Sequence, residues 1–274
     1  MHGHCRVMVH LTAFATIFVA VVACGDVTSE RTAIQPDASI ATAAPPAAPS
    51  GVATAGATVA PSPSATAGPS VVGDEERDMD LIAAAAAGDL EDVNQLLRQG
   101  ASVDARDGRG RTALIAAAYG DHLAVAEALI AAGADVNVKD DTQQSAYLIP
   151  TADGSLAMLR LALRSGADVH SLDSYNGTGL IRAADRGHVE IIRELLTTPI
   201  AIDHVNRLGW TALLEAIILG RGDERHTEVV RLLVAAGANV NLADGNGVTP
   251  LAHARQRGQA AIAEILLQAG ARPQ

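Results

Sequence analysis

Apolar positions in the later two thirds of the chain come in short paired runs. A run rich in Ala, Leu and Ile is followed, after a brief polar break, by a second run with apolar residues at i, i+3 and i+4, as at Val189, Ile192 and Leu195-Leu196. This spacing places the apolar side chains on one face of a helix. The pattern therefore predicts pairs of short helices, and one pair alone cannot bury its apolar face.

The predicted helix pairs recur with a fixed period. Gly-Ala dipeptides mark the end of most pairs, and they begin at Gly100, Gly133, Gly166, Gly237 and Gly270. Their usual spacing is 33 residues; Pro199-Ile200 fills the missing slot, and 38 residues separate it from Gly237. A period of this length predicts a solenoid, in which neighbouring pairs stack and share one apolar interior.

Two polar positions mark each repeat from the second to the sixth. A Thr or Ser precedes each first helix, where its hydroxyl can accept a hydrogen bond from a free amide of the first helical turn. These residues are Thr112, Ser145, Thr178, Thr211 and Thr249. An Asp or Asn recurs at one position of the preceding turn: Asp107, Asp140, Asp173, Asn206 and Asp244. We expect the two positions to fix the helix starts and the turns.

These motifs resemble the ankyrin repeat. Repeat two contains Thr112-Ala113-Leu114 and Gly133-Ala134-Asp135-Val136-Asn137, and repeat six contains Thr249-Pro250-Leu251. The stretch His204–Ala216 is also similar to short bacterial ankyrin-repeat proteins. The resemblance implies an all-α ankyrin-repeat solenoid of about six helix-turn-helix repeats with β-hairpin fingers. We place the domain at 74–274, with repeats near 80–107, 108–140, 141–173, 174–206, 207–244 and 245–274.

Repeat three departs most from the family pattern. Pro150 stands inside its first helix, where a proline removes a backbone donor and costs about 3 kcal/mol. Gln143 occupies the turn position that favours Gly. We therefore expect repeat three to be locally distorted and to be a weak point of the stack. Repeat five carries an insertion near Arg221–Arg225, which we place between its two helices.

The first residues predict an export signal. Val7–Ala23 is an apolar run at the extreme N-terminus, and it is short for a membrane span. Its end, Val21-Val22-Ala23-Cys24, resembles the lipobox of bacterial lipoproteins, which implies a signal peptide at 1–23 and acylation of Cys24. The alternative is an ordinary signal peptide with a chance cysteine. In a Gram-negative cell, Gly25 after the cysteine favours the outer membrane.

The segment at 24–73 differs in composition from the repeats. It is rich in Ala, Pro, Ser and Thr and has no apolar periodicity. Such a sequence cannot bury enough apolar surface to offset the entropy of ordering, so we expect a disordered linker. We therefore expect a repeat domain that a lipid anchor and a tether hold in the bacterial envelope, where it faces the periplasm or the exterior.

The net charge and the motifs present in the chain restrict the classes of function that we expect. The net charge of −11 disfavours nucleic-acid binding, because an acidic surface repels phosphates. The chain has no cysteine after Cys24, and it lacks zinc-protease, nucleophile-elbow and phosphate-loop motifs. His188 and His226 match a structural position of the family. We therefore expect no cofactor, no metal, no small-molecule substrate and no enzymatic activity.

The resemblance implies that a protein partner binds along the concave side, at the finger tips and first helices. The candidate residues in these positions are Arg109, Arg111, Tyr175, Arg207, Leu208 and Trp210, since aromatic residues and Arg dominate interface hot spots. Trp210 could instead pack against a neighbouring turn. The expected function is a lipid-anchored scaffold or adaptor for protein–protein interaction. The alternatives are an accessory regulator or protector of an envelope enzyme and, third, an enzyme with an unrecognised site.

Overall fold

The computed structural model describes residues 71–273. The expected signal peptide at 1–23, the lipidation candidate Cys24 and residues 25–70 of the expected linker lie outside the described residues. The first helix begins at Val71. This helix begins three residues before the boundary that the sequence predicts at 74.

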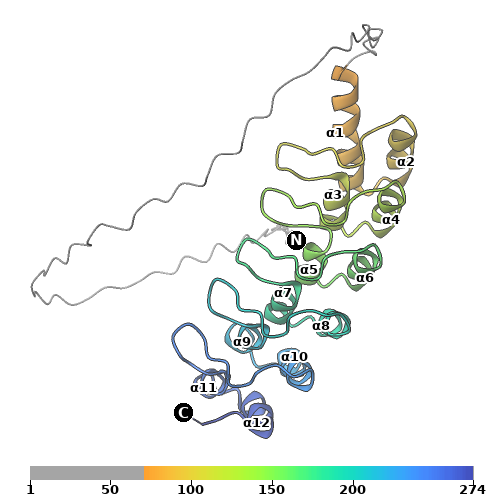
Figure 1. Ribbon diagram of the computed structural model, residues 1–274. Helices are drawn as coiled ribbons and strands as arrows, with labels where there is room; N and C mark the ends of the chain where they lie inside the picture. The colour runs from red at the N-terminus through yellow and green to blue at the C-terminus, as the bar shows by residue number, and fades with distance from the viewer. Residues whose placement is uncertain (1–70, 274) are drawn as a thin grey trace, which may run out of the picture. The chain divides into compact units, whose positions relative to one another are not determined.

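Residues 71–273 form six pairs of helices (Figure 1). The pairs are α1 (Val71–Ala87) with α2 (Leu90–Arg98), α3 (Ala113–Tyr119) with α4 (Leu123–Ala131), α5 (Leu148–Asp153) with α6 (Leu156–Arg164), α7 (Gly179–Arg186) with α8 (Val189–Leu195), α9 (Ala212–Ile218) with α10 (Glu224–Ala235), and α11 (Pro250–Gln256) with α12 (Ala260–Gln268). Each first helix packs against the next first helix, and the second helices pack in the same order. The predicted stack of repeats is confirmed.

The interior of the stack is aliphatic. Leu114, Leu180, Leu213 and Leu251 occupy the same position in four first helices, and each is almost completely buried. Complete burial of a Leu side chain stabilises a fold by about 1.5–3 kcal/mol. Alanines fill the positions between neighbouring first helices, as at Ala117, Ala184 and Ala216, where no solvent reaches the side chains. Small side chains at these positions let successive helix layers approach closely.

Four of the five predicted helix caps are confirmed, and the fifth residue, Ser145, makes the same kind of bond without directly preceding its helix. The hydroxyl of each capping residue accepts a hydrogen bond from the amide three residues later, over 3.2–3.4 Å. The caps that directly precede their helices are Thr112, Thr178, Thr211 and Thr249, whereas α5 begins after Tyr147 and Ser145 accepts from the Leu148 amide from two residues further back. All five Thr and Ser residues are buried, and each satisfies an amide of the first helical turn that is buried or partly buried.

The loop before the first helix in each of repeats two to six, which we call a finger, is held by the recurring Asp or Asn. Asp107 Oδ1 accepts from the amides of Arg109 (2.8 Å) and Arg111 (3.0 Å), and the same pattern recurs at Asp140, Asp173, Asn206 and Asp244. The expectation of β-hairpin fingers needs correction, because residues 71–273 contain no β-strand. A finger is closed by isolated backbone bonds, such as Asp107 N to Arg111 O, rather than by a ladder.

Repeat three is distorted where the sequence predicts it. Its helix α5 is the shortest helix of residues 71–273 and begins three residues after Ser145, whereas α3, α7, α9 and α11 begin directly after their Thr caps. Pro150 has no amide to bond with Ala146 O, so the first turn is irregular. Gln143 adopts a φ of 64°, a left-handed conformation that favours Gly.

The insertion in repeat five lengthens a helix. Asp223 caps α10 by accepting a hydrogen bond from the His226 amide over 3.0 Å. Its α10 has 12 residues, whereas α2, α4, α6, α8 and α12 have seven to nine. Of the residues that the sequence places between the helices, Glu224 and Arg225 instead extend the start of α10, Asp223 caps it, and Arg221 and Gly222 lie in the link after α9.

Histidines join consecutive repeats. His188 Nε2 donates to Ala152 O over 2.9 Å, and His226 Nε2 donates to Asp185 O over 3.1 Å. Both acceptors lie at or near the end of the preceding repeat's first helix, where carbonyls lack helical partners. The structural role predicted for His188 and His226 is confirmed.

Candidate protein-binding site

The six candidate residues lie on three fingers. Arg109 and Arg111 belong to the finger of repeat two, Tyr175 to that of repeat four, and Arg207, Leu208 and Trp210 to that of repeat five. The last two fingers are adjacent, since the Arg207 amide donates to Tyr175 O over 2.9 Å. The finger of repeat three separates them from the Arg109 and Arg111 pair, so the candidates do not form one cluster.

The basic candidates are partly committed to contacts within the chain. The Arg111 guanidinium pairs with Asp107 over 2.7 Å, and Arg207 Nη1 donates to Ser174 O over 2.8 Å. Trp210 is half-buried, and its amide donates to Asn206 Oδ1. Tyr175 and Leu208 are the two candidates that the structure brings together.

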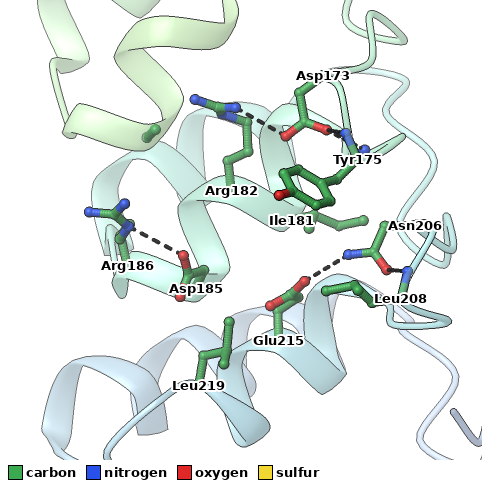
Figure 2. A pocket seen from close by; sticks show the side chains of 12 residues that line it. Asp173, Tyr175, Ile181, Arg182, Asp185, Arg186, Asn206, Leu208, Glu215 and Leu219 are labelled. Atoms are coloured by element: carbon green, nitrogen blue, oxygen red, sulfur yellow. Dashed lines mark hydrogen bonds and ion pairs between the residues drawn. The ribbon is translucent and has the colours of Figure 1, made fainter. Parts of the chain in front are cut away.

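Tyr175 and Leu208 line a pocket of about 300 Å³ between repeats four and five. We call it the repeat 4–5 pocket. Its lining residues come from α5, α7, α9, the residue after α9 and two fingers: Ala152, Asp173, Tyr175, Gly177, Ile181, Arg182, Asp185, Arg186, Asn206, Leu208, Glu215 and Leu219. Figure 2 shows Glu215 lying among Leu208, Leu219 and Tyr175, with its carboxylate facing Asn206.

The pocket has an exposed apolar rim. Tyr175 is 63% exposed, Leu208 51% and Leu219 49%. Large apolar side chains normally avoid such exposure when several lie together, and a group of them marks an interaction surface more often than a lone one does. The rim is thus the part of the finger-side surface best suited to contact another protein.

The polar residues of the pocket follow the repeat register. In repeats four, five and six, the finger Asp or Asn is bonded to a side chain nine residues later on the first helix. The pairs are Asp173 with Arg182 at 3.0 Å, Asn206 with Glu215 at 2.7 Å, and Asp244 with His253 at 2.8 Å. Repeat five therefore differs from repeats four and six: its first helix carries the acid, and its finger carries a neutral amide.

Glu215 is the most unusual group of the pocket. Its side chain lies in the interior, only 4% exposed, and its Oε2 has no hydrogen-bond donor among the described residues. Burial raises the pKa of Glu215 to about 7; the Asn206 hydrogen bond lowers this pKa, and the carboxylates of Asp185 and Asp173 raise it. A carboxyl group in this state changes charge near neutral pH.

Four of the pocket residues are ones that the sequence does not single out: Arg182, Asp185, Glu215 and Leu219. A signal for two of them was present in the register: the fourth residue after each cap is Ala116 and Ile149 in repeats two and three, then Arg182 and Glu215. This change from apolar to ionisable residues shows where polar side chains enter the first helices. Asp185 and Leu219 carry no comparable signal.

Residues 71–273 offer neither a metal-binding cluster nor a helix that could cross a membrane. No group of three or more His, Cys, Asp or Glu side chains is placed there to hold a metal ion. Among the same residues, none of the helices combines the length and the apolar character that crossing a bilayer requires.

Comparison with known proteins agrees with the geometry. The family model described as ankyrin repeats (3 copies) matches residues 81–173, 146–242 and 180–274. The chain is 46% identical over 96 residues to the ankyrin repeat protein YahD of Escherichia coli K12; this match covers 35% of the chain and 48% of YahD. The chain thus spans about half the length of this curated relative.

Solved structures are similar to this chain over a larger share of its length. An ankyrin repeat domain from Acinetobacter baumannii AYE is 51% identical with a TM-score of 0.68, and the match covers 70% of this chain and 98% of that one. The ankyrin repeat protein EF0377 is 34% identical with a TM-score of 0.67 over the same shares. The ankyrin repeat domain of Bcl-3 is 27% identical with a TM-score of 0.63, covering 70% and 86%. The chain belongs to the ankyrin-repeat family.

Proposed function

We propose that the protein is an envelope scaffold or adaptor that binds a protein partner at the repeat 4–5 pocket. Ankyrin repeats are protein-interaction scaffolds, and the stack presents a rigid surface built from consecutive fingers and first helices. The observation that carries the assignment to this place is the rim of Tyr175, Leu208 and Leu219, three exposed apolar side chains around one pocket.

The second part of the proposal concerns the location. The apolar run at Val7–Ala23 and the lipobox-like Val21–Cys24 support export and acylation of Cys24. The Ala- and Pro-rich segment that follows supports a tether between the lipid and the repeats. The protein would then present its finger-side surface to partners in the periplasm or outside the cell.

A matched pair of variants tests the binding surface. Leu208→Ser with Leu219→Ser removes most of the apolar rim, whereas Leu267→Ser changes a Leu of similar exposure on α12. The full chain is used to capture partners from envelope extracts, and the dissociation constant of the purified partner is then measured by surface plasmon resonance. We expect the double variant to bind at least tenfold more weakly and the α12 variant to bind normally. Equal affinities of the double variant and the unaltered chain would overturn the assignment.

The lipid anchor has a separate test. Cys24→Ser should abolish incorporation of radiolabelled palmitate and release the protein from the membrane fraction, while Cys5→Ser should change neither. Labelling that persists in the Cys24→Ser variant would refute acylation at this residue.

A further inference from the structure

The carboxylate of Glu215 is incompletely satisfied. Oε1 accepts a hydrogen bond from Asn206 Nδ2 over 2.7 Å, but Oε2 is buried and has no donor among the described residues. Buried polar atoms are nearly always hydrogen-bonded, and an exception calls for an explanation such as a missing partner group. Glu215 lines the repeat 4–5 pocket, so a group that enters this pocket from outside is placed to supply the donor.

The other charged groups of the pocket form two ion pairs, although the buried Nε of Arg182 has no acceptor among the described residues. Asp173 is paired with Arg182 at 3.0 Å, and Asp185 is paired with Arg186 at 3.2 Å. Glu215 is bonded instead to the neutral amide of Asn206. The charge that the pocket lacks is therefore positive, because an ionised carboxylate in a desolvated place is stabilised most by a cation.

The walls of the pocket suit a long basic side chain. Tyr175, Leu208 and Leu219 form the rim, and Ile181 lies deeper and is buried. Methylene groups of Lys or Arg pack on apolar surfaces of this kind while the charged end reaches a polar group. The ring of Tyr175 can also attract a cation over its face. The rim side chains are about half exposed or more, so they can change rotamer to give access to Oε2.

We propose that the repeat 4–5 pocket receives a Lys or Arg side chain of the protein partner, with its cationic group donating to Glu215 Oε2 and its stem lying against Tyr175, Leu208 and Leu219. This inference rests on the proposed function and specifies the chemistry of the partner. A basic partner surface also complements the net charge of −11 of the chain.

The surroundings of Glu215 define how this binding depends on pH. Asp173 and Tyr175 face it from the finger of repeat four, and Arg182 and Asp185 face it from α7. On the helices packed against α9, His253 of α11 is bonded to Asp244, and His226 of α10 is bonded to Asp223. Because burial raises the pKa of Glu215 to about 7, the ionised form that attracts a cation becomes depleted below this pH. Binding of the basic side chain should weaken as the pH falls from 8 to 6.

Small probes test the pocket directly. N-acetyl-lysine methylamide and N-acetyl-norleucine methylamide share an apolar stem, and only the lysine compound carries a cation. Each is titrated at pH 8 into the full chain with labelled Leu methyl groups, and the methyl signals of Leu208 and Leu219 are followed by NMR. We expect the lysine compound to bind at least tenfold more tightly than the norleucine compound. Equal affinities, tighter binding of N-acetyl-glutamate methylamide, or signals that move elsewhere would overturn the proposal.

Two variants examine the role of Glu215. Glu215→Gln keeps the shape of the side chain but places an amide donor near the position of Oε2, and it should remove the preference for lysine. Asn206→Asp with Glu215→Arg copies the pair of repeat four and keeps the fold by a contact that the chain already uses. It should also remove the preference, whereas Glu190→Gln, on the exposed part of α8, should leave it intact. A lysine preference that survives both pocket variants would refute the inference.

The affinity of the natural partner for these variants distinguishes this inference from the proposed function. If the partner loses affinity with the Leu208 and Leu219 double variant but not with Glu215→Gln, the binding surface stands and the basic side chain is wrong. If neither change affects the partner, the proposed surface is wrong, and the lysine titration still decides whether the pocket accepts a cation.

Discussion

Replacing Glu215 with Gln should change the pH dependence of folding stability. Burial raises the pKa of Glu215 from 4.5 to about 7, so the folded chain holds this proton more tightly than the unfolded chain does. Ionisation therefore opposes folding, and this penalty grows as the pH rises from 4.5 and levels off above 7. At about 1.4 kcal/mol per pKa unit, the penalty increases by about 2.5 kcal/mol between pH 5 and pH 8. Gln cannot ionise, so the variant lacks the penalty.

Urea unfolding of both proteins at pH 5 and pH 8 measures this effect. Trp210 is the single tryptophan and lies in the finger of repeat five, so its fluorescence reports on the repeat that contains Glu215. We expect the variant to gain about 2.5 kcal/mol relative to the unaltered chain between the two pH values. Any constant cost of the new amide cancels in this difference. A stability difference that is the same at both pH values within about 0.5 kcal/mol would show that Glu215 is ionised normally, and the reasoning about its burial would be wrong.

Three further predictions concern repeats three and five. Hydrogen exchange of the α5 amides should be faster than exchange in α3 and α7, and Pro150→Ala should slow it by restoring a donor to Ala146 O; equal rates in all three helices would contradict the weak point. Thr211→Val should lower the free energy of unfolding by about 1 kcal/mol, because the Leu214 amide loses its cap, and urea titration would detect an unchanged midpoint if the cap were unimportant. Trp210→Ala should leave partner affinity within about threefold, since the half-buried Trp210 is not part of the pocket lining.

The sequence predicts the fold well because the same local residue pattern recurs in successive repeats. The caps from Thr112 to Thr249 and the finger residues from Asp107 to Asp244 recur at fixed positions, and each makes the same local hydrogen bonds. Hydrogen bonds between residues that are close in the sequence can be predicted without knowing how the rest of the chain packs. Pro150 is predictable for the same reason, since its effect is confined to one helical turn.

The site was harder to predict because it depends on contacts between repeats. Tyr175 and Leu208 stood out by residue type and position, but Arg109 and Arg111 have the same features and lie on another part of the surface. Glu215 was missed for two reasons. It is buried where α9 packs against α7, and its hydrogen-bond partner is the neutral Asn206, nine residues earlier in the chain. Neither burial nor a missing partner can be seen in a single repeat.

Site-specific photo-crosslinking in living cells tests the central claim most directly. A benzophenone side chain is introduced at position 208, on the rim of the repeat 4–5 pocket, or at position 190, an exposed position on α8. The account predicts a discrete crosslinked protein from position 208 after irradiation and a much weaker product, or none, from position 190. Crosslinking of the same protein with equal or greater yield from position 190 would contradict the claim that partners bind at this pocket.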